Sequence, residues 1–251
     1  MGRKLAAVAL AVSVSLPAWA DDPWKEKAYT EWTQEDVRKV LNDSPWARRV
    51  IVQAPWARDS RLGRITPQDR APGAGSGQTL ETSRPGGAES PAPAIQSEAA
   101  QIPEATFVVR WVSARTLRRA MVRAQQLRGA LSAEEGEKQL APEAPFYQVL
   151  VVGPDMTPFQ KADEIQLKEK AQLRLKKSKQ KLAPDRVEIH RSEDGKRVAA
   201  ILFHFLKKTP AGEPTIAPDE KGIEFLCRAG GVSLKVTFEL AKMAGREGAD
   251  L

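Results

Sequence analysis

Residues 223–238 read IEFLCRAGGVSLKVTF, and this stretch predicts an antiparallel hairpin with its turn at Gly230 and Gly231. With that turn, the apolar side chains share one face in opposed pairs: Cys227 with Leu234, Phe225 with Val236, and Ile223 with Phe238. The polar side chains take the other face: Glu224, Arg228, Lys235, Thr237 and Glu239. One apolar and one polar face is typical of an antiparallel sheet that covers a core on one side.

A second hairpin is predicted within residues 187–205, because Asp194-Gly195 is a pair that tight hairpin turns prefer. A two-residue turn there places His190 and His204 on opposite faces of the sheet. The two histidines are therefore not expected to form a site together.

The rest of the ordered chain carries helix and strand signals in alternation. Helix-start residues followed by apolar residues at helical spacing predict helices over residues 33–42, 113–131 and 157–173, beginning at Thr33, Ser113 and Thr157. Short apolar runs predict strands over residues 49–54, 107–112 and 146–152.

The first twenty residues have the pattern of a cleavable signal peptide. Arg3 and Lys4 precede an apolar run at residues 5–16, which is too short to span a bilayer. Small residues at 18–20 predict cleavage after Ala20. We therefore expect a periplasmic or secreted protein with no transmembrane segment once the peptide is removed.

The predicted architecture is a single α+β domain, an antiparallel sheet with two or three helices, interrupted by a long disordered stretch. Residues 57–103 form that stretch, because they are rich in Pro and Gly and poor in large apolar residues. Residues 21–56 hold four of the six Trp, which require burial, so this helix-strand segment is expected to dock on the main α+β domain, residues 104–251.

No complete catalytic or metal-binding motif occurs in the sequence, so no catalytic residue, metal ligand or cofactor is predicted. Residues 178–181 match an SxxK pattern, but its companion motifs SDN and KTG are missing. The single cysteine, Cys227, alternates with apolar residues and is expected to be a small buried hydrophobe.

Two basic segments indicate where a partner can bind. Residues 105–133 hold six Arg and no acidic residue, and residues 161–181 hold eight Lys or Arg against three acidic residues. The candidate ligand-binding residues are Arg115, Arg118, Arg119, Arg123, Lys176, Lys177, Lys179 and Lys181. Outside the cytoplasm the matching partner is an anionic envelope component or an acidic protein rather than nucleic acid. The alternative is that these charges only solvate helix surfaces.

The opening block of the mature chain resembles a group of uncharacterised secreted bacterial proteins. The residues that carry the resemblance are Asp22-Pro23-Trp24, Trp32-Thr33, Asp36-Val37, Val40-Leu41 and Ser44-Pro45-Trp46-Ala47, with a similar closing section from Pro184 to Leu240. The resemblance implies export and brings no activity, cofactor or site residue with it.

Two functions remain open from the sequence. The first is an exported, non-enzymatic, envelope-associated binding or interaction protein, indicated by the Trp and basic clusters together with the missing catalytic motifs. The alternative is a secreted hydrolase whose carboxylates converge only in the folded chain.

Overall fold

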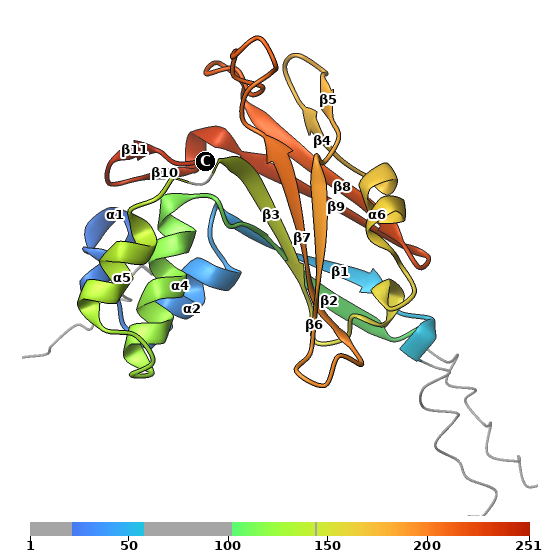
Figure 1. Cartoon of the computed structure of the whole chain (residues 1–251), viewed down its shortest axis with the longest axis horizontal. Helices are drawn as coiled ribbons and strands as arrows, with labels where there is room; N and C mark the ends of the chain where they lie inside the picture. Colours follow the sequence, from blue (N-terminus) through green and yellow to red (C-terminus); the bar gives the residue numbers. More distant parts are fainter. Residues whose placement is uncertain (1–21, 58–101, 144) are drawn as a thin grey trace, which may run out of the picture.

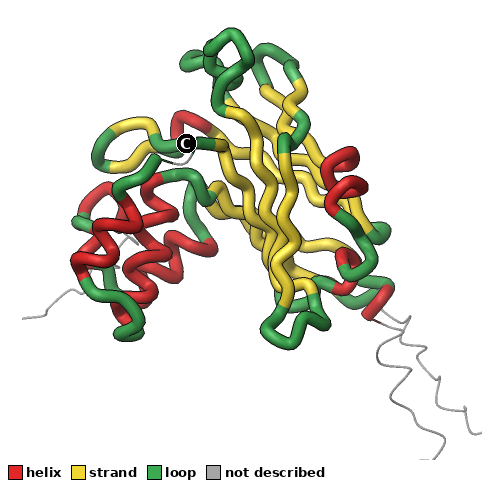
Figure 2. The backbone as a smooth tube through the Cα atoms, viewed as in Figure 1, coloured by secondary structure: helices red, strands yellow, loops and turns green. Residues whose placement is uncertain are grey.

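The computed structural model describes residues 22–57, 102–143 and 145–251. Two antiparallel sheets pack face to face, and a group of helices lies beside them (Figures 1 and 2). The predicted signal peptide, residues 1–20, lies outside the described residues. The predicted disordered stretch, residues 57–103, also lies outside them apart from its two ends.

The described residues form five α-helices, more than the two or three expected, and the α+β class with antiparallel sheets is confirmed. The α-helices are α1 (Pro23–Glu26), α2 (Gln34–Asn42), α4 (Arg115–Leu127), α5 (Ala133–Leu140) and α6 (Glu164–Lys170). Short 3-10 helices are η1 (Tyr29–Glu31), η3 (Thr157–Phe159) and η4 (Leu240–Lys242). The strands are β1 (Ala47–Gln53), β2 (Glu104–Trp111), β3 (Phe146–Val152), β4 (Ala171–Leu175), β5 (Lys181–Leu182), β6 (Arg186–Arg191), β7 (Val198–Leu206), β8 (Gly222–Ala229), β9 (Val232–Glu239), β10 (Ala244–Gly245) and β11 (Gly248–Ala249).

The larger sheet has the strand order β1-β2-β3-β7-β6, and the smaller main sheet has the order β5-β4-β8-β9. The β8–β9 hairpin has the predicted register, with Cys227 opposite Leu234 and Phe225 opposite Val236. Its turn requires glycine, because Gly230 has a φ of +53° and a Cβ there would collide with the backbone of Pro158.

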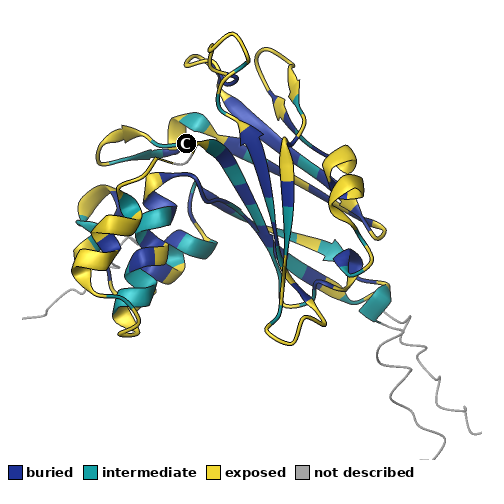
Figure 3. Cartoon of the chain, in the orientation of Figure 1, coloured by how far each residue is buried: buried dark blue, intermediate teal, exposed yellow. Residues whose placement is uncertain are grey.

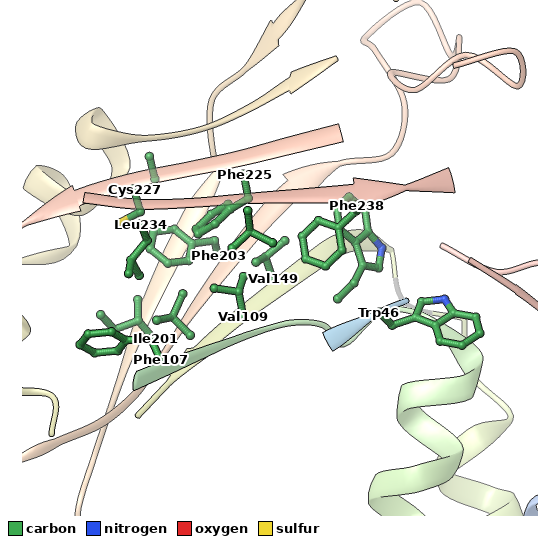
Figure 4. Packing of buried hydrophobic residues seen from close by; sticks show 14 of the residues in the cluster. Trp46, Phe107, Val109, Val149, Ile201, Phe203, Phe225, Cys227, Leu234 and Phe238 are labelled. Carbon is green, nitrogen blue, oxygen red and sulfur yellow. The ribbon is translucent and has the colours of Figure 1, made fainter. Parts of the chain in front are cut away.

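The core lies between the two sheets, where aromatic side chains meet edge to face (Figure 4). The ring centroids of Phe203 and Phe225 are 5.3 Å apart, and those of Trp111 and Phe238 are also 5.3 Å apart. Figure 3 shows buried positions alternating with intermediate ones along β3. The edge-to-face ring contacts favour particular orientations of the aromatic side chains, in addition to the stabilisation that burial of apolar area provides.

The opening segment shares that core. The helix α2 begins at the predicted cap, where the Thr33 side chain accepts from the Asp36 backbone N–H. Strand β1 pairs with β2 along its whole length and so forms the edge of the larger sheet. The Trp46 side chain is fully buried, and its indole nitrogen donates to the Asp250 backbone carbonyl at 2.7 Å.

The predicted start of the second helix at Ser113 is wrong. The helix α4 begins at Arg115, and the Ser113 hydroxyl instead accepts from the Gln148 backbone N–H at 3.2 Å. The Asp250 carboxylate accepts from the first two backbone N–H groups of the helix, at 2.6 Å from Arg115 and 2.7 Å from Thr116. A distant carboxylate thus supplies the cap that local sequence suggested for Ser113.

The prediction of one helix over residues 157–173 is also wrong. The 3-10 turn η3 is followed by α6, and β4 begins at Ala171. Buried positions at Ala171, Leu173 and Leu175 recur at every second residue, a strand period that overrides the preceding helical one. In addition, α5 was not predicted, although Ser132 and Glu135 form a reciprocal capping box at its start.

The predicted separation of the two histidines is wrong as well. An irregularity between His190 and Arg191 shifts the register by one residue, so that His190 lies opposite Ala200. His190 and His204 therefore lie on the same face of the larger sheet, because one extra residue in a strand reverses the direction of every later side chain. Glu188 lies between them, with a carboxylate oxygen 3.2 Å from the His204 Nε2 atom.

The first prediction concerns Cys227, whose burial raises the pKa of its thiol to about 12. Since the thiolate is the reactive form, a thiol-specific reagent should modify the native protein very slowly and the denatured protein completely. Mass spectrometry of the labelled protein measures both. Rapid labelling under native conditions would contradict the packing of the β8–β9 hairpin described above.

The second prediction concerns the cap of α4. Asp250→Ala should lower the free energy of unfolding by about 1 kcal/mol, as loss of a helix N-cap does. Asp219→Ala is the control, because Asp219 is an exposed carboxylate that pairs with the Lys177 side chain and caps no helix in the described part of the chain. Equal unfolding free energies for the two variants in urea would show that Asp250 does not stabilise the helix.

Candidate functional site

A pocket of about 400 Å³ opens where the opening segment, the start of α4 and the β10–β11 turn meet. We call it the Trp–Arg pocket and define it by the residues that carry its chemistry: Trp24, Lys27, Tyr29, Trp32, Arg115, Arg119 and residues 245–250. Figure 1 shows these elements together at the helical side of the molecule, with β10 and β11 directly above α1 and α4. The pocket combines segments from both ends of the described chain.

Two arginines of the pocket converge on one carboxylate. Arg115 and Arg119 are four residues apart on α4 and so lie on the same helix face. Both guanidinium groups bind Glu247, with Arg119 Nη2 at 2.7 Å from one oxygen and Arg115 bound to the other. The hydrogen bond from Arg119, together with that from Arg115, holds the pKa of Glu247 below its usual range.

Aromatic side chains form the opposite wall. Trp32 is buried, and its indole nitrogen donates to the Pro23 carbonyl at 3.1 Å. The Arg119 guanidinium lies over the Tyr29 ring, with its Cζ atom 5.6 Å from the ring centroid. The Tyr29 hydroxyl donates to the Glu137 carboxylate. Trp24 is only 5% exposed, and its indole N–H has no acceptor among the described residues. An unpaired buried donor is uncommon in folded proteins.

The other two predicted arginines hold structural elements together. Arg118 donates to the carbonyls of Gln139 and Leu140, at 2.9 and 3.0 Å, and so caps the end of α5. Arg123 donates to the Trp32 carbonyl at 2.9 Å and ties the opening segment to α4. These contacts place Arg118 and Arg123 outside the lining of the Trp–Arg pocket.

The predicted lysines lie elsewhere. Lys176 and Lys179 line a separate depression together with Arg174, and the Lys177 side chain pairs with Asp219. Lys181 begins β5. Figure 1 shows the β4–β5 hairpin well separated from α4, so the two basic segments do not share one cavity.

His204 and Glu188 pair with each other outside the Trp–Arg pocket. His204 is buried, and its pKa lies below the usual range because burial disfavours the charged ring more than Glu188 favours it. Its Nδ1 atom is 3.3 Å from the Gln148 amide nitrogen. Within the described ranges, no group of three or more His, Cys, Asp or Glu could hold a metal ion.

Sequence reasoning did not identify Glu247, Lys27 or Arg246 as site residues. Glu247 could not be found by spacing, because it is more than a hundred residues from its partners on α4. The Trp cluster in residues 21–56 was the one usable signal, since Trp24 and Trp32 form a wall of the pocket.

No protein-family model, curated protein or solved structure matches the chain. Among the residues that the structure describes, there is no helix with the length and apolar character needed to cross a bilayer. The chain is an α+β protein with two packed antiparallel sheets and, at one side, a pocket lined by cationic and aromatic side chains.

The third prediction tests the Tyr29 contact. Burial, together with the Glu137 hydrogen bond and charge, raises the pKa of Tyr29 from 10.0 to about 12. The neutral phenol is thus favoured in the folded state, and its contribution to stability is present below pH 10 and lost between pH 10 and pH 12. Glu137→Gln should move the pKa of Tyr29 down toward 10.0.

Phenolate absorbance in a Tyr147→Phe background measures this, because the chain has only two tyrosines. Glu134→Gln is the control, since Glu134 is on the same helix but pairs with Lys138. The contact is absent if Tyr29 titrates identically in the Glu137 and Glu134 variants.

Proposed function

We propose that the protein is an exported, non-enzymatic, envelope-associated binding protein whose Trp–Arg pocket receives an anionic group of its partner. The observation that carries the proposal is the convergence of Arg115 and Arg119 on a single carboxylate inside a concave pocket. Two guanidinium groups directed at one acceptor are a typical arrangement for anion recognition.

The charges around this pair also favour an anion. Lys27, which also pairs with Asp36 at 3.1 Å, and Arg246 line the same pocket, so four cationic side chains line it together with the carboxylates of Glu247 and Asp250. The side chains of Arg115 and Arg119 are 52% and 30% exposed, so an incoming group can reach them. An aromatic wall beside cations supports binding of a group that carries both charge and flat or apolar surface.

Export and envelope association rest on the sequence. The first twenty residues have the pattern of a signal peptide, and the opening block resembles secreted bacterial proteins. Two observations support a binding role rather than a catalytic one. The sequence has no complete catalytic motif, and the pocket is lined mainly by cationic and aromatic side chains, with Glu247 and Asp250 as its carboxylates.

The fourth prediction tests the arginine pair. A double variant, Arg115→Gln with Arg119→Gln, should retain an envelope partner about two- to thirtyfold less than the unmodified protein, since each partly exposed charge pair contributes up to about 1 kcal/mol. Retention is measured by pull-down from envelope extract at low and high salt. High salt should reduce retention by the unmodified protein, because exposed charge interactions are screened.

Arg191→Gln is the matched control, because Arg191 ends β6, away from the lining of the pocket. A second variant, Lys176→Gln with Lys179→Gln, tests whether the partner binds the other basic segment, at the β4–β5 hairpin. Loss of the partner only in this lysine variant would place the contact on the β4–β5 hairpin and refute the pocket. Turnover of esters or glycosides, with no partner retained at either salt concentration, would favour the secreted hydrolase instead.

A further inference from the structure

We infer that the anionic partner is an acidic peptide segment, and that Glu247 on the β10–β11 turn is an internal carboxylate that such a segment displaces. This inference rests on the proposed function and names the partner class of the same site. Glu247 already lies between the two arginines of the pocket.

Glu247 is held there by a short hairpin. Gly245 pairs with Gly248, so that Arg246 and Glu247 are the two residues of the turn. The left-handed backbone at Gly248, with a φ of +97°, lets the chain reverse directly after Glu247. A carboxylate presented by a turn of peptide chain is therefore the ligand that the arginine pair already accepts.

The internal carboxylate is well placed for displacement. The Glu247 side chain is 51% exposed, and Arg115 is similarly exposed, so water competes for both groups. Exposed ion pairs of this kind contribute little to stability. A partner carboxylate that binds with more than one contact can therefore replace Glu247 without unfolding the hairpin.

The pocket also holds a donor that Glu247 does not use. Arg246 is exposed at the turn, lines the pocket, and has no ion-pair or hydrogen-bond partner among the described side chains. A peptide supplies acceptors for it, since each residue carries a backbone carbonyl besides any acidic side chain. This unused donor thus favours a peptide over an isolated anion.

A lipid headgroup fits less well. The large apolar side chains that the described residues expose are Ile51, Ile102, Met121, Leu127, Ile165 and Leu206, and none of them lines the pocket. Acyl chains would find no exposed aliphatic surface at the mouth of the pocket. An acidic peptide segment needs no apolar surface at the mouth of the pocket, and its carboxylates match the cationic side chains that line it.

The fifth prediction uses a fluorescently labelled peptide rich in Glu, with the matching Gln peptide as the uncharged probe. Glu247→Gln should bind the Glu peptide about two- to fivefold more tightly than the unmodified protein, because removal of an exposed ion pair frees the arginines. Glu239→Gln is the matched control, since Glu239 is 50% exposed and pairs with Lys242 outside the pocket. Arg119→Gln should weaken binding of the Glu peptide.

Fluorescence anisotropy gives the affinities, and thermal unfolding checks that each variant folds. Equal affinity of Glu247→Gln and Glu239→Gln for the Glu peptide would overturn the inference, as would equal binding of the Glu and Gln peptides. Binding of vesicles with anionic lipid or of an acidic polysaccharide, without binding of the Glu peptide, would overturn the inference and leave the proposed function standing. If no anionic probe binds and the arginine variant retains its envelope partner, both fail.

Discussion

The junction at Asp250 holds together three parts of the chain that are far apart in the sequence. Its carboxylate accepts from the first backbone N–H groups of α4, and its carbonyl accepts from the buried Trp46 indole. The opening segment, the central helix and the last strands are thereby fixed relative to one another. Because the Trp–Arg pocket lies at the meeting point of these three parts, its geometry depends on this junction.

The positive charge of α4 explains why a carboxylate at its first turn is stabilising. The helix has no acidic residue in its first turn, and Arg115, Arg119 and Arg123 follow one another at four-residue spacing. Like charges at that spacing repel, and cations at a helix start oppose the helix dipole. Asp250 and Glu247 supply the missing negative charge from the end of the chain, while the Trp32 carbonyl accepts from Arg123. The arginine-rich face is therefore partly an internal docking surface, and its Arg115 and Arg119 also line the pocket where we propose that an outside anion binds.

Predictions from sequence succeeded where local pattern and tertiary packing agree. The β8–β9 register follows from strict alternation of apolar residues around two glycines, and the α2 cap follows from Thr33 and Asp36. They failed where a residue far away in the sequence, or one extra residue in a strand, determines the local geometry. Asp250 rather than Ser113 caps α4, and an irregularity after His190 places the two histidines on one face of the sheet. Of the eight predicted site residues, Arg115 and Arg119 line the pocket, whereas Arg118 and Arg123 serve internal contacts.

The sequence by itself determined the α+β class, the antiparallel pairing of the last two long strands and the burial of the Trp-rich opening segment. These features follow from periodicity, turn residues and the cost of exposing large aromatic rings, all of which act over a few neighbouring residues. The tertiary structure alone decided which arginines face a pocket and which carboxylate they bind. Glu247 and α4 come together only in the folded chain, because the contact joins residues more than a hundred positions apart, and no local pattern encodes such a pairing.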